Sequence, residues 1–425
     1  MVLSTGKVAD SDAERLRVAM VARLEPGLEA IGLPMPEALR AALLRTPRHL
    51  FTPETSLEQA YANESIVTKT SVEGVNLSAV SAPGVISGML AQAGDLAGKR
   101  VLEIGSGGYN SALLRELVGP AGEVTTLDID PEVVDRARTC LDLAGYHDVR
   151  TLCRDGEFGA SEYAPFDLII ATVGVWDVTP EWVRQLTPSG RVVLPLRTRG
   201  LTRSWALDRD GDRLVGTSQI QCGFVPMQGI GEHRGRSVAL DESGVGLWLD
   251  ELGPLDADGL AGVLGQPRAE VWSGVTLRRR ELWADQDLWL LAAPRSCQMT
   301  SSQAAVERGV VDPSWRILTP ALVEGDSLAY RARLKPLDDP ATVFELGAFG
   351  HGPRGGELAE QLGQEIRDWD QARRRGARPR LTVLPANTPG EDLPDGYVIA
   401  KRHSTLVLSW DHATSAPPSP DGSPS

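Results

Sequence analysis

The stretch V-L-E-I-G-S-G-G-Y-N, which occupies residues 101–110, decides the fold of this chain. Its first residues complete a short apolar segment typical of a buried β-strand, and the glycines after them form a tight turn before a helix. Gly105 permits the turn, and Gly107 lets a ligand approach the backbone closely. A bare strand-to-helix turn explains the stretch nearly as well, so the segments on either side have to decide what it binds.

Strands and helices alternate through the residues around the glycine turn. We expect strands at residues 100–104, 123–127, 149–153, 166–172 and 191–196, helices at residues 111–118, 131–143 and 180–186, and a turn at 188–190. Alternation of this kind implies parallel strand pairing in a doubly wound α/β sheet. Ahead of the sheet, apolar spacing and a favourably placed proline predict helices at residues 12–24 and 36–45.

The pattern changes after about Gly235. Short alternating runs predict antiparallel strands at residues 237–240, 245–249, 269–277 and 287–293. A strand-helix-strand unit is expected at residues 342–346, 357–374 and 380–383, and a last strand at 405–410. Because 425 residues exceed one ordinary core, we expect several units. They are an N-terminal helical segment (1–75), an α/β core (76–235), an α+β domain (236–411) and a disordered tail (412–425).

The composition disfavours several classes of protein. A net charge of −14 is unsuited to binding phosphate backbones, so no nucleic-acid partner is expected. No apolar run reaches the length of a membrane helix and the N-terminus lacks a signal-peptide pattern, so we expect no membrane partner and a cytoplasmic location. The four cysteines are widely spaced, which disfavours zinc sites and disulfides.

Three groups of residues in the second half allow two interpretations each. Residues 373–380 contain five arginines, which we interpret as a solvated helix end rather than a docking surface for an acidic peptide. His351 and His403 lack metal-ligand spacing, so no metal is expected. The tryptophans are more typical of a core than of a peptide groove; they are Trp248, Trp272, Trp283 and Trp289.

Acidic residues beyond the glycine turn indicate its ligand. Asp128 ends the second strand about 20 residues downstream, where a carboxylate can accept hydrogen bonds from both ribose hydroxyls. Asp130 is expected instead to cap the helix that follows. Asp155-Gly156 follows the third strand and suits an adenine amino group, although an isolated Asp-Gly is more often a turn. In series, the three features favour an adenosine ligand.

Two further residues bear on the glycine turn. Glu103 suits either a ligand contact or a satisfied carboxylate at the strand end. Asn110 stands where a dinucleotide fingerprint has its third glycine, which disfavours NAD. No acid or base suited to hydride transfer is evident either, so an oxidoreductase is a weaker interpretation.

The sequence resembles class I S-adenosylmethionine (SAM) methyltransferases in the order of four features along the chain. These features are the glycine turn, Asp128, Asp155-Gly156 and the F-D-L of residues 166–168. The flanking segments resemble one branch, the protein-L-isoaspartate O-methyltransferases, over residues 12–235. These segments are T-P-R-H-L-F (46–51), A-Y (60–61), V-S-A-P (80–83), L-T-P-S-G-R-V-V-L-P (186–195) and G-F-V-P (223–226). The resemblance implies a Rossmann-like class I fold with N-terminal helices, SAM as cofactor and methylation of a carboxylate.

The resemblance also implies roles for individual residues. Ser81 matches the family's active-site serine. Gln228 matches a position that closes over the site, and residues 78–80 form the strand that borders the cofactor. The cofactor-binding residues implied in full are Ser78, Val80, Glu103, Gly105, Ser106, Gly107, Asn110, Asp128, Ile129, Asp155, Gly156, Thr172 and Gln228.

Departures from the repair enzymes point to a specialised group. Ser78-Ala79 replaces the usual Gln-Thr or Ala-Thr, and the residues after Gly235 have no counterpart in ordinary repair enzymes. Residues 108–110 and E-L-G-A-F-G-H-G (345–352) resemble homologues encoded beside ribosomally made, modified peptides such as lanthipeptides, the FxLD-system methyltransferases. This resemblance implies esterification of an ordinary aspartate in a precursor peptide, leading through an aspartimide to isoaspartate.

Two alternatives stay open. The chain could repair isoaspartate in many proteins, with isoaspartyl peptides as its partners. It could also be a non-catalytic SAM-binding scaffold that recruits a precursor peptide, although Ser81 and the full set of cofactor residues argue against that.

Overall fold

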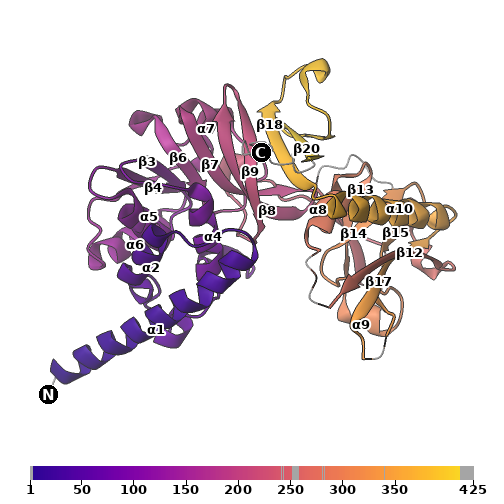
Figure 1. Cartoon of the computed structure of the whole chain (residues 1–425), viewed down its shortest axis with the longest axis horizontal. Helices are drawn as coiled ribbons and strands as arrows, with labels where there is room; N and C mark the ends of the chain where they lie inside the picture. The colour runs from indigo at the N-terminus through magenta and orange to yellow at the C-terminus, as the bar shows by residue number, and fades with distance from the viewer. Residues whose placement is uncertain are drawn as a thin grey trace, which may run out of the picture.

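A computed structural model of the chain describes residues 3–240, 242, 244–250, 258–279, 281, 283–338 and 340–411. These residues form two lobes, with the N-terminal helix α1 at one end and helix α10 across the lobe at the other (Figure 1). The tail expected to be disordered, 412–425, lies outside the described residues.

The first lobe is built on a long mixed sheet. Over the described residues its strand order is β19-β20-β18-β9-β8-β7-β6-β3-β4-β5. Its central strands are parallel, as predicted: β3 (Arg100–Ile104) pairs with β4 (Glu123–Asp128) and β6 (Phe166–Ala171), β4 pairs with β5 (Arg150–Cys153), and β6 pairs with β7 (Leu186–Thr198). The chain therefore reverses direction across the sheet between β3 and β6, as the predicted doubly wound fold requires.

Helices cover both faces of this sheet. They are α4 (Pro83–Ala93), α5 (Tyr109–Val118), α6 (Pro131–Leu143) and α7 (Pro180–Gln185), with the short turns η2 (Gly156–Phe158), η3 (Ser161–Tyr163) and η4 (Gly229–Gly231). A hairpin of β1 (Ile66–Thr70) and β2 (Asn76–Val80) forms a separate two-stranded sheet.

The N-terminal helices pack on the core as expected, but the first is longer. Helix α1 spans Leu3–Ala30, beyond the predicted residues 12–24, and contains Pro26. Leu28 is buried one turn after Leu24. The burial of Leu28 stabilises the helix beyond Pro26. After it come α2 (Glu37–Arg45), η1 (Arg48–Phe51) and α3 (Leu57–Ala60).

The structure corrects the expected turn at residues 188–190. Strand β7 runs through it, and a register irregularity against β6 absorbs the extra residues between Leu186 and Arg191. Two strands that sequence patterning missed, β8 (Leu201–Asp210) and β9 (Arg213–Gln221), continue the sheet in antiparallel fashion.

The second lobe contains an antiparallel sheet. Its order is β10-β11-β13-β14-β15-β17-β12, with β16 also pairing with β17. The strands are β10 (Arg236–Ala239), β11 (Val245–Leu249), β12 (Ala269–Arg278), β13 (Ser296–Ser301), β14 (Thr319–Glu324), β15 (Ser327–Arg331), β16 (Lys335–Pro336) and β17 (Val343–His351). The other elements are η5 (Asp258–Leu260), η6 (Val263–Gly265), α8 (Asp285–Ala292), α9 (Gln303–Glu307) and α10 (Gly355–Arg374).

One predicted strand of this lobe is a helix. Residues 287–293 lie mostly in α8, with Leu288, Leu291 and Ala292 buried at helical spacing. A short, almost continuous apolar run fits a buried strand and a buried helix equally well. Asp285 and Asp287 in the first turn favour the helix because they interact well with the positive end of its dipole.

The last strands correct the expected domain map. β18 (Arg378–Pro385) pairs with β9 of the first lobe, then with β20 (Ser404–Asp411), which pairs with β19 (Tyr397–Ala400). Figure 1 shows these strands beside β9, between it and the second lobe. The expected α+β domain of residues 236–411 therefore divides, and the expected strand-helix-strand unit joins two different sheets. The short η7 (Gly390–Asp392) lies between β18 and β19.

A buried ionic cluster joins the two lobes. The Asp250 side chain, at the end of β11, is fully buried, and its two oxygens lie 3.1 Å from Arg197 Nε and 3.1 Å from His233 Nε2. Farther along the joint, the buried Arg203 of β8 donates to the Ala284 carbonyl at 2.6 Å.

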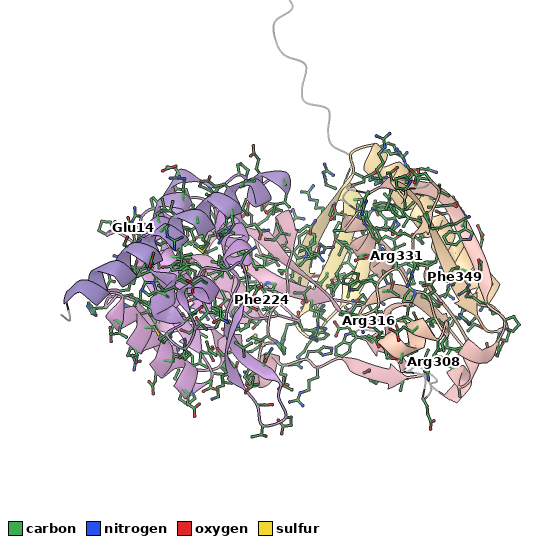
Figure 2. All side chains as sticks on the ribbon, turned by 90° about the horizontal axis from the view of Figure 1, so that it is seen from below. Glu14, Phe224, Arg308, Arg316, Arg331 and Phe349 are labelled. Carbon is green, nitrogen blue, oxygen red and sulfur yellow. The ribbon has the colours of Figure 1, made fainter. Side chains whose placement is uncertain are left out.

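Arg331 lies within the second lobe (Figure 2), where it pairs with Asp287 of α8 at 2.6 Å.

Three of the four tryptophans and two of the five arginines have partners within the second lobe, and Arg375, Arg378 and Arg380 are exposed, as a solvated helix end requires. Trp272, Trp283 and Trp289 lie against the second lobe's hydrophobic clusters. Arg373 and Arg374 both pair with Asp370 in the last turns of α10. None of the helices described here is long and apolar enough to cross a membrane.

Because β18 pairs with both β9 and β20, a cavity created in β20 should destabilise the first lobe. Leu406 is fully buried among residues of the first lobe such as Leu207 and Leu214. Leu406→Ala should lower the free energy of unfolding by about 2–5 kcal/mol and speed amide hydrogen exchange in β7–β9. Leu346→Ala, an equally buried leucine of the second lobe, is the matched control and should loosen residues 236–351. Exchange in β7–β9 unchanged by Leu406→Ala would contradict the fold described.

Candidate functional site

The glycine turn and Asp128 are joined directly at the carboxyl edge of the parallel strands. β3 and β4 pair in register, with Ile104 opposite Leu127, so the residues after each strand meet. Asp128 Oδ2 accepts from Ser106 N at 3.0 Å, and Oδ1 accepts from Asp130 N at 3.0 Å. The carboxylate keeps further lone pairs for a ligand, as a ribose-binding residue needs. Burial raises the pKa of Asp128.

Asp130 takes the role expected of it. Its side chain caps α6 by accepting from Glu132 N. Lys69 of the β1–β2 hairpin also lies 2.6 Å from Asp130 and 2.7 Å from Glu132. The hairpin is thereby tied to the start of α6, next to Asp128.

Thr172 fixes the glycine turn from the other side. Gly105 has φ +93°, and a Cβ there would lie 2.7 Å from Val173 Cγ1, so no larger residue fits. The Thr172 hydroxyl donates to the Gly105 carbonyl at 2.6 Å. The two predicted site residues meet at the point where the sheet reverses direction, the usual ligand position in such sheets.

Asp155 and Gly156 lie under the η4 loop, residues 228–231. Asp155 Oδ1 accepts from Glu157 N at 2.9 Å, and Oδ2 accepts from Ile230 N at 2.9 Å. A Cβ on Gly229 (φ +83°) would collide with Asp155 and with Ile129. Asp155-Gly156 stays a predicted ligand contact, and in the structure the η4 loop closes on it.

The Gly156 backbone has a second support that sequence reasoning missed. The buried Trp182 of α7 donates from Nε1 to the Gly156 carbonyl at 2.9 Å. A Cβ on Gly156 would lie 2.6 Å from Ile104 Cγ2. The glycine is therefore required for the end of β5 to approach the end of β3.

Strand β2 borders the glycine turn. A Cβ on Gly107 would lie 3.5 Å from the Ala79 carbonyl oxygen and 3.9 Å from Val80 Cα. The Ser78 hydroxyl is buried and accepts from Thr68 Oγ1 at 3.0 Å. The side chains of Ser78 and Val80 thus serve packing, and the β2 backbone faces the turn. Gln228 Nε2 donates to Leu77 O at 3.5 Å, linking the η4 loop to the hairpin.

Ser81 follows β2 directly. It is half-buried and lies between Val80 and Ala82, the N-cap residue of α4. Its position beside the glycine turn is the one that the family resemblance implies for the active-site serine.

Glu103 and Asn110 turn into the protein. Glu103 is fully buried and accepts from Asn110 Nδ2 at 2.8 Å and from the Ser111 hydroxyl. Burial raises the pKa of Glu103. Of its two interpretations, the geometry favours the satisfied strand-end carboxylate, which fixes α5 behind the turn. Asn110 acts as the partner of Glu103.

Arg48 positions the site, a role that sequence reasoning did not assign. It is fully buried, and its guanidinium donates to Ala60 O at 2.8 Å and to Val80 O at 3.4 Å. It also stacks over the ring of Tyr109, the first residue of α5, at 4.8 Å. Burial lowers the pKa of Arg48. Residues 47, 49 and 50 around it are only half-buried, and no pattern in the sequence distinguishes a buried arginine here from an exposed one.

The histidines of the second half lie apart from each other. His351 is buried and stacks on Tyr330, whereas His403 lies 3.1 Å from Glu157. Within the described ranges, no three His, Cys, Asp or Glu side chains gather as metal ligands would.

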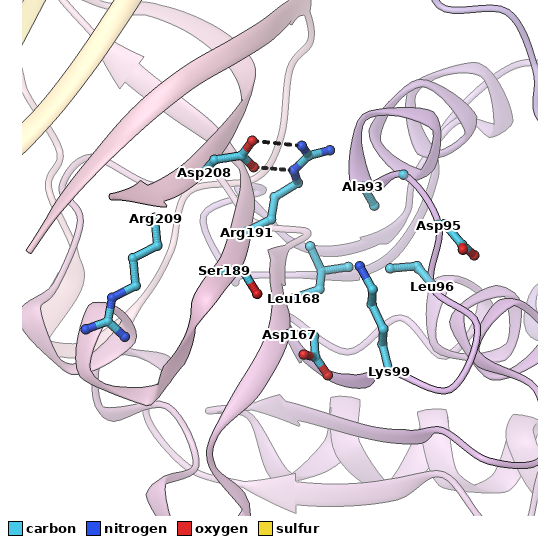
Figure 3. A pocket seen from close by; sticks show the side chains of 11 residues that line it. Ala93, Asp95, Leu96, Lys99, Asp167, Leu168, Ser189, Arg191, Asp208 and Arg209 are labelled. Carbon is cyan, nitrogen blue, oxygen red and sulfur yellow. Dashed lines mark hydrogen bonds and ion pairs between the residues drawn. The ribbon is translucent and has the colours of Figure 1, made fainter. Parts of the chain in front are cut away.

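A surface pocket of about 540 Å³ lies at the opposite edge of the sheet. Lys99, Asp167 and Ser189 line it near the amino ends of β3, β6 and β7, and Arg191 pairs there with Asp208 (Figure 3). Ligands of doubly wound sheets bind at the carboxyl ends of the strands, so this pocket is not the candidate site.

Comparison with known proteins agrees with the geometry. The family model of protein-L-isoaspartate(D-aspartate) O-methyltransferase matches residues 24–231. The protein-L-isoaspartate O-methyltransferase of Methanopyrus kandleri is 33% identical over 210 residues, which cover 49% of this chain and 90% of that protein. The chain belongs to the protein-L-isoaspartate O-methyltransferase family. It is a carboxyl O-methyltransferase, and its cofactor is SAM.

Solved protein-L-isoaspartate O-methyltransferase structures also align with the chain. One covers 92% of this chain and 99% of its own, at 19% identity and a TM-score of 0.47. Another, from Plasmodium falciparum in complex with S-adenosylhomocysteine, covers 48% of this chain and 97% of its own, at 14% identity and a TM-score of 0.41.

The residues at the methyltransferase site fit the cofactor. The Ser106 hydroxyl is buried and has no hydrogen-bond partner within the described part of the chain. A ligand atom beside the glycine turn would satisfy it. Gly105, Gly156 and Gly229 let the strand ends and the η4 loop approach one another closely, because a Cβ at each would collide with neighbouring protein atoms. Asp128 offers a carboxylate to the ligand. These residues would hold the adenosine of SAM.

Asp128→Asn should weaken binding of S-adenosylhomocysteine about 10- to 100-fold, because an amide accepts fewer hydrogen bonds and loses the charge. Titration calorimetry measures the change. Asp135→Asn, at an exposed aspartate of helix α6, is the matched control, and its affinity should stay close to that of the unmodified chain. Equal affinities for the two variants would contradict the assignment of Asp128.

Proposed function

We propose that this methyltransferase esterifies an ordinary aspartate side chain of a ribosomally made, lanthipeptide-like precursor peptide, and that the ester leads through an aspartimide to isoaspartate. The main support is the second lobe. It adds residues 236–375 to a chain whose predicted site residues all lie within the family match at residues 24–231, and the buried Asp250 cluster joins it to the first lobe.

The methyl transfer needs little from the protein beyond alignment. An aspartate carboxylate titrates near ~4 and is already ionised at neutral pH, so it needs no general base. SAM supplies a methyl group activated on its sulfonium sulfur. Holding the acceptor oxygen in line with that methyl can contribute on the order of 7–11 kcal/mol. We assign to Ser81 the hydrogen bond that holds the acceptor carboxylate or its neighbouring amide.

The ester explains how a methyltransferase can rearrange a backbone. The nitrogen of the following residue attacks the ester carbonyl carbon, loses its proton, and methoxide leaves and is protonated to methanol. The product is the five-membered aspartimide. Water then opens the ring at either carbonyl and gives isoaspartate or aspartate. Each step balances without an oxidant or reductant.

The second lobe offers contact area that a short peptide would not find at the methyltransferase site alone. A constrained peptide offers little contact area to a site built around a single carboxylate, and stable recognition depends on buried anchors. A lobe joined to the first through the buried Asp250 cluster provides an additional surface for a leader segment. The departures at Ser78-Ala79 and residues 108–110 also set this chain apart from the repair enzymes.

The comparisons favour a second candidate, general repair of isoaspartate. The relatives are named for that activity, and the glycine turn, Asp128 and Ser81 serve either acceptor. The two functions differ in breadth: a repair enzyme should accept most isoaspartyl peptides, whereas the proposed enzyme should select one precursor.

Ser81→Ala separates acceptor binding from cofactor binding. We expect kcat/KM for the acceptor peptide to fall by about 10- to 100-fold, since a hydrogen bond to a charged group is lost. Affinity for S-adenosylhomocysteine should stay unchanged in calorimetry. An unchanged rate of methanol release would remove Ser81 from the site, and no methanol release by the unmodified chain would favour the scaffold alternative.

A peptide panel tests the acceptor. With SAM, mass spectrometry should show methyl gain on the precursor peptide encoded nearby, followed by loss of methanol, and little reaction with unrelated isoaspartyl peptides. Broad methylation of the isoaspartyl panel would instead establish repair. A methyl ester that persists without methanol loss would contradict the rearrangement while leaving the methylation intact.

A further inference from the structure

The turn between β19 and β20, residues 401–404, reaches from the added C-terminal strands into the methyltransferase site. Lys401 N donates to Ser404 O at 2.9 Å and closes the turn. Its residues contact three loops of the first lobe, at residues 156–157, 176–177 and 229–231. The family match ends at residue 231, so these contacts come from outside the matched segment.

Arg402 holds the η4 loop from the side opposite to Asp155. Arg402 Nη1 donates to Ile230 O at 2.8 Å, and Ile230 N donates to Asp155 Oδ2 at 2.9 Å. Both polar backbone groups of Ile230 are thereby engaged. The loop that closes on the adenine side of the site is fixed between one predicted cofactor residue and one residue of the added strands.

His403 acts on the same loop through Glu157. His403 Nε2 lies 3.1 Å from Glu157 Oε1. The other oxygen of Glu157 faces the η4 loop, where a Cβ on Gly231 would lie 2.8 Å from it. Burial raises the pKa of Glu157, and His403 opposes that change. A buried carboxylate under the loop is thus paired by the added turn.

The turn is itself firmly held. His403 N and Ser404 Oγ each donate to Asp177 at 2.6 Å. The buried Lys401 donates to Trp176 O and to Arg197 O, each at 2.6 Å. Since Arg197 also pairs with Asp250, the turn is continuous with the joint between the lobes. A fixed turn can keep a loop in place, whereas a mobile one could not.

We propose that Arg402 and His403 are positioning residues for the cofactor, which hold the η4 loop closed over the adenine side of the site. The inference rests on the SAM site assigned above. Ordering a loop on binding costs backbone entropy, and a loop already ordered before binding avoids that cost. Neither residue needs to touch SAM.

Calorimetry with S-adenosylhomocysteine tests the proposal without knowledge of the acceptor peptide. Arg402→Ala and His403→Ala should each weaken binding by about threefold to tenfold. Arg402→Lys should recover part of the loss, because it keeps the charge and one donor. Arg378→Ala, an exposed arginine of the same added strands, is the matched control and should bind normally.

Steady-state kinetics adds a readout that a purely structural role would not give. The KM for SAM should rise in Arg402→Ala while kcat stays within about twofold, since the loop affects binding and not the transfer step. Affinity in Arg402→Ala equal to that in Arg378→Ala would overturn the proposal. So would a loss of affinity that parallels a lowered Tm and that Arg402→Lys does not restore. Absence of binding by the unmodified chain would instead overturn the cofactor site itself.

Discussion

The hydrogen bond from Ser106 N to Asp128 Oδ2, 3.0 Å long, is the contact on which the site depends. It exists because β3 and β4 are parallel and in register, which brings the ends of both strands to one edge. A glycine turn there exposes backbone amides, and the carboxylate of Asp128, 22 residues further along the chain, accepts a hydrogen bond from one of them. The Thr172 hydroxyl, the η4 loop and the β1–β2 hairpin all pack around this contact.

The sequence predicted the part of the fold in which local signals agree. Alternating strands and helices, Pro131 after Asp130, and the glycine turn each specify a local geometry, and the structure confirms the doubly wound sheet and the cap on α6. The site residues Gly105, Asp128, Asp155 and Thr172 lie together because the topology requires it. Their roles toward SAM stay predictions.

The remainder depended on contacts between residues far apart in the chain. Residues 287–293 form a helix because α8 packs between two hydrophobic clusters, which periodicity over seven residues cannot reveal. Strand β18 pairs with β9, more than 150 residues earlier, so no local pattern indicates its sheet. Burial also decided the interior roles of Glu103 and Arg48, because a charged residue gives no sign in the sequence of whether it is paired inside.

A structure of the chain crystallised with S-adenosylhomocysteine is the most direct test of the central claim. We predict that both ribose hydroxyls lie within hydrogen-bonding distance of the Asp128 carboxylate, with adenine beside Gly156 under the η4 loop and sulfur toward Ser81. Nucleoside bound anywhere else, for example in the pocket at Lys99 and Asp167 on the opposite edge, would contradict the account.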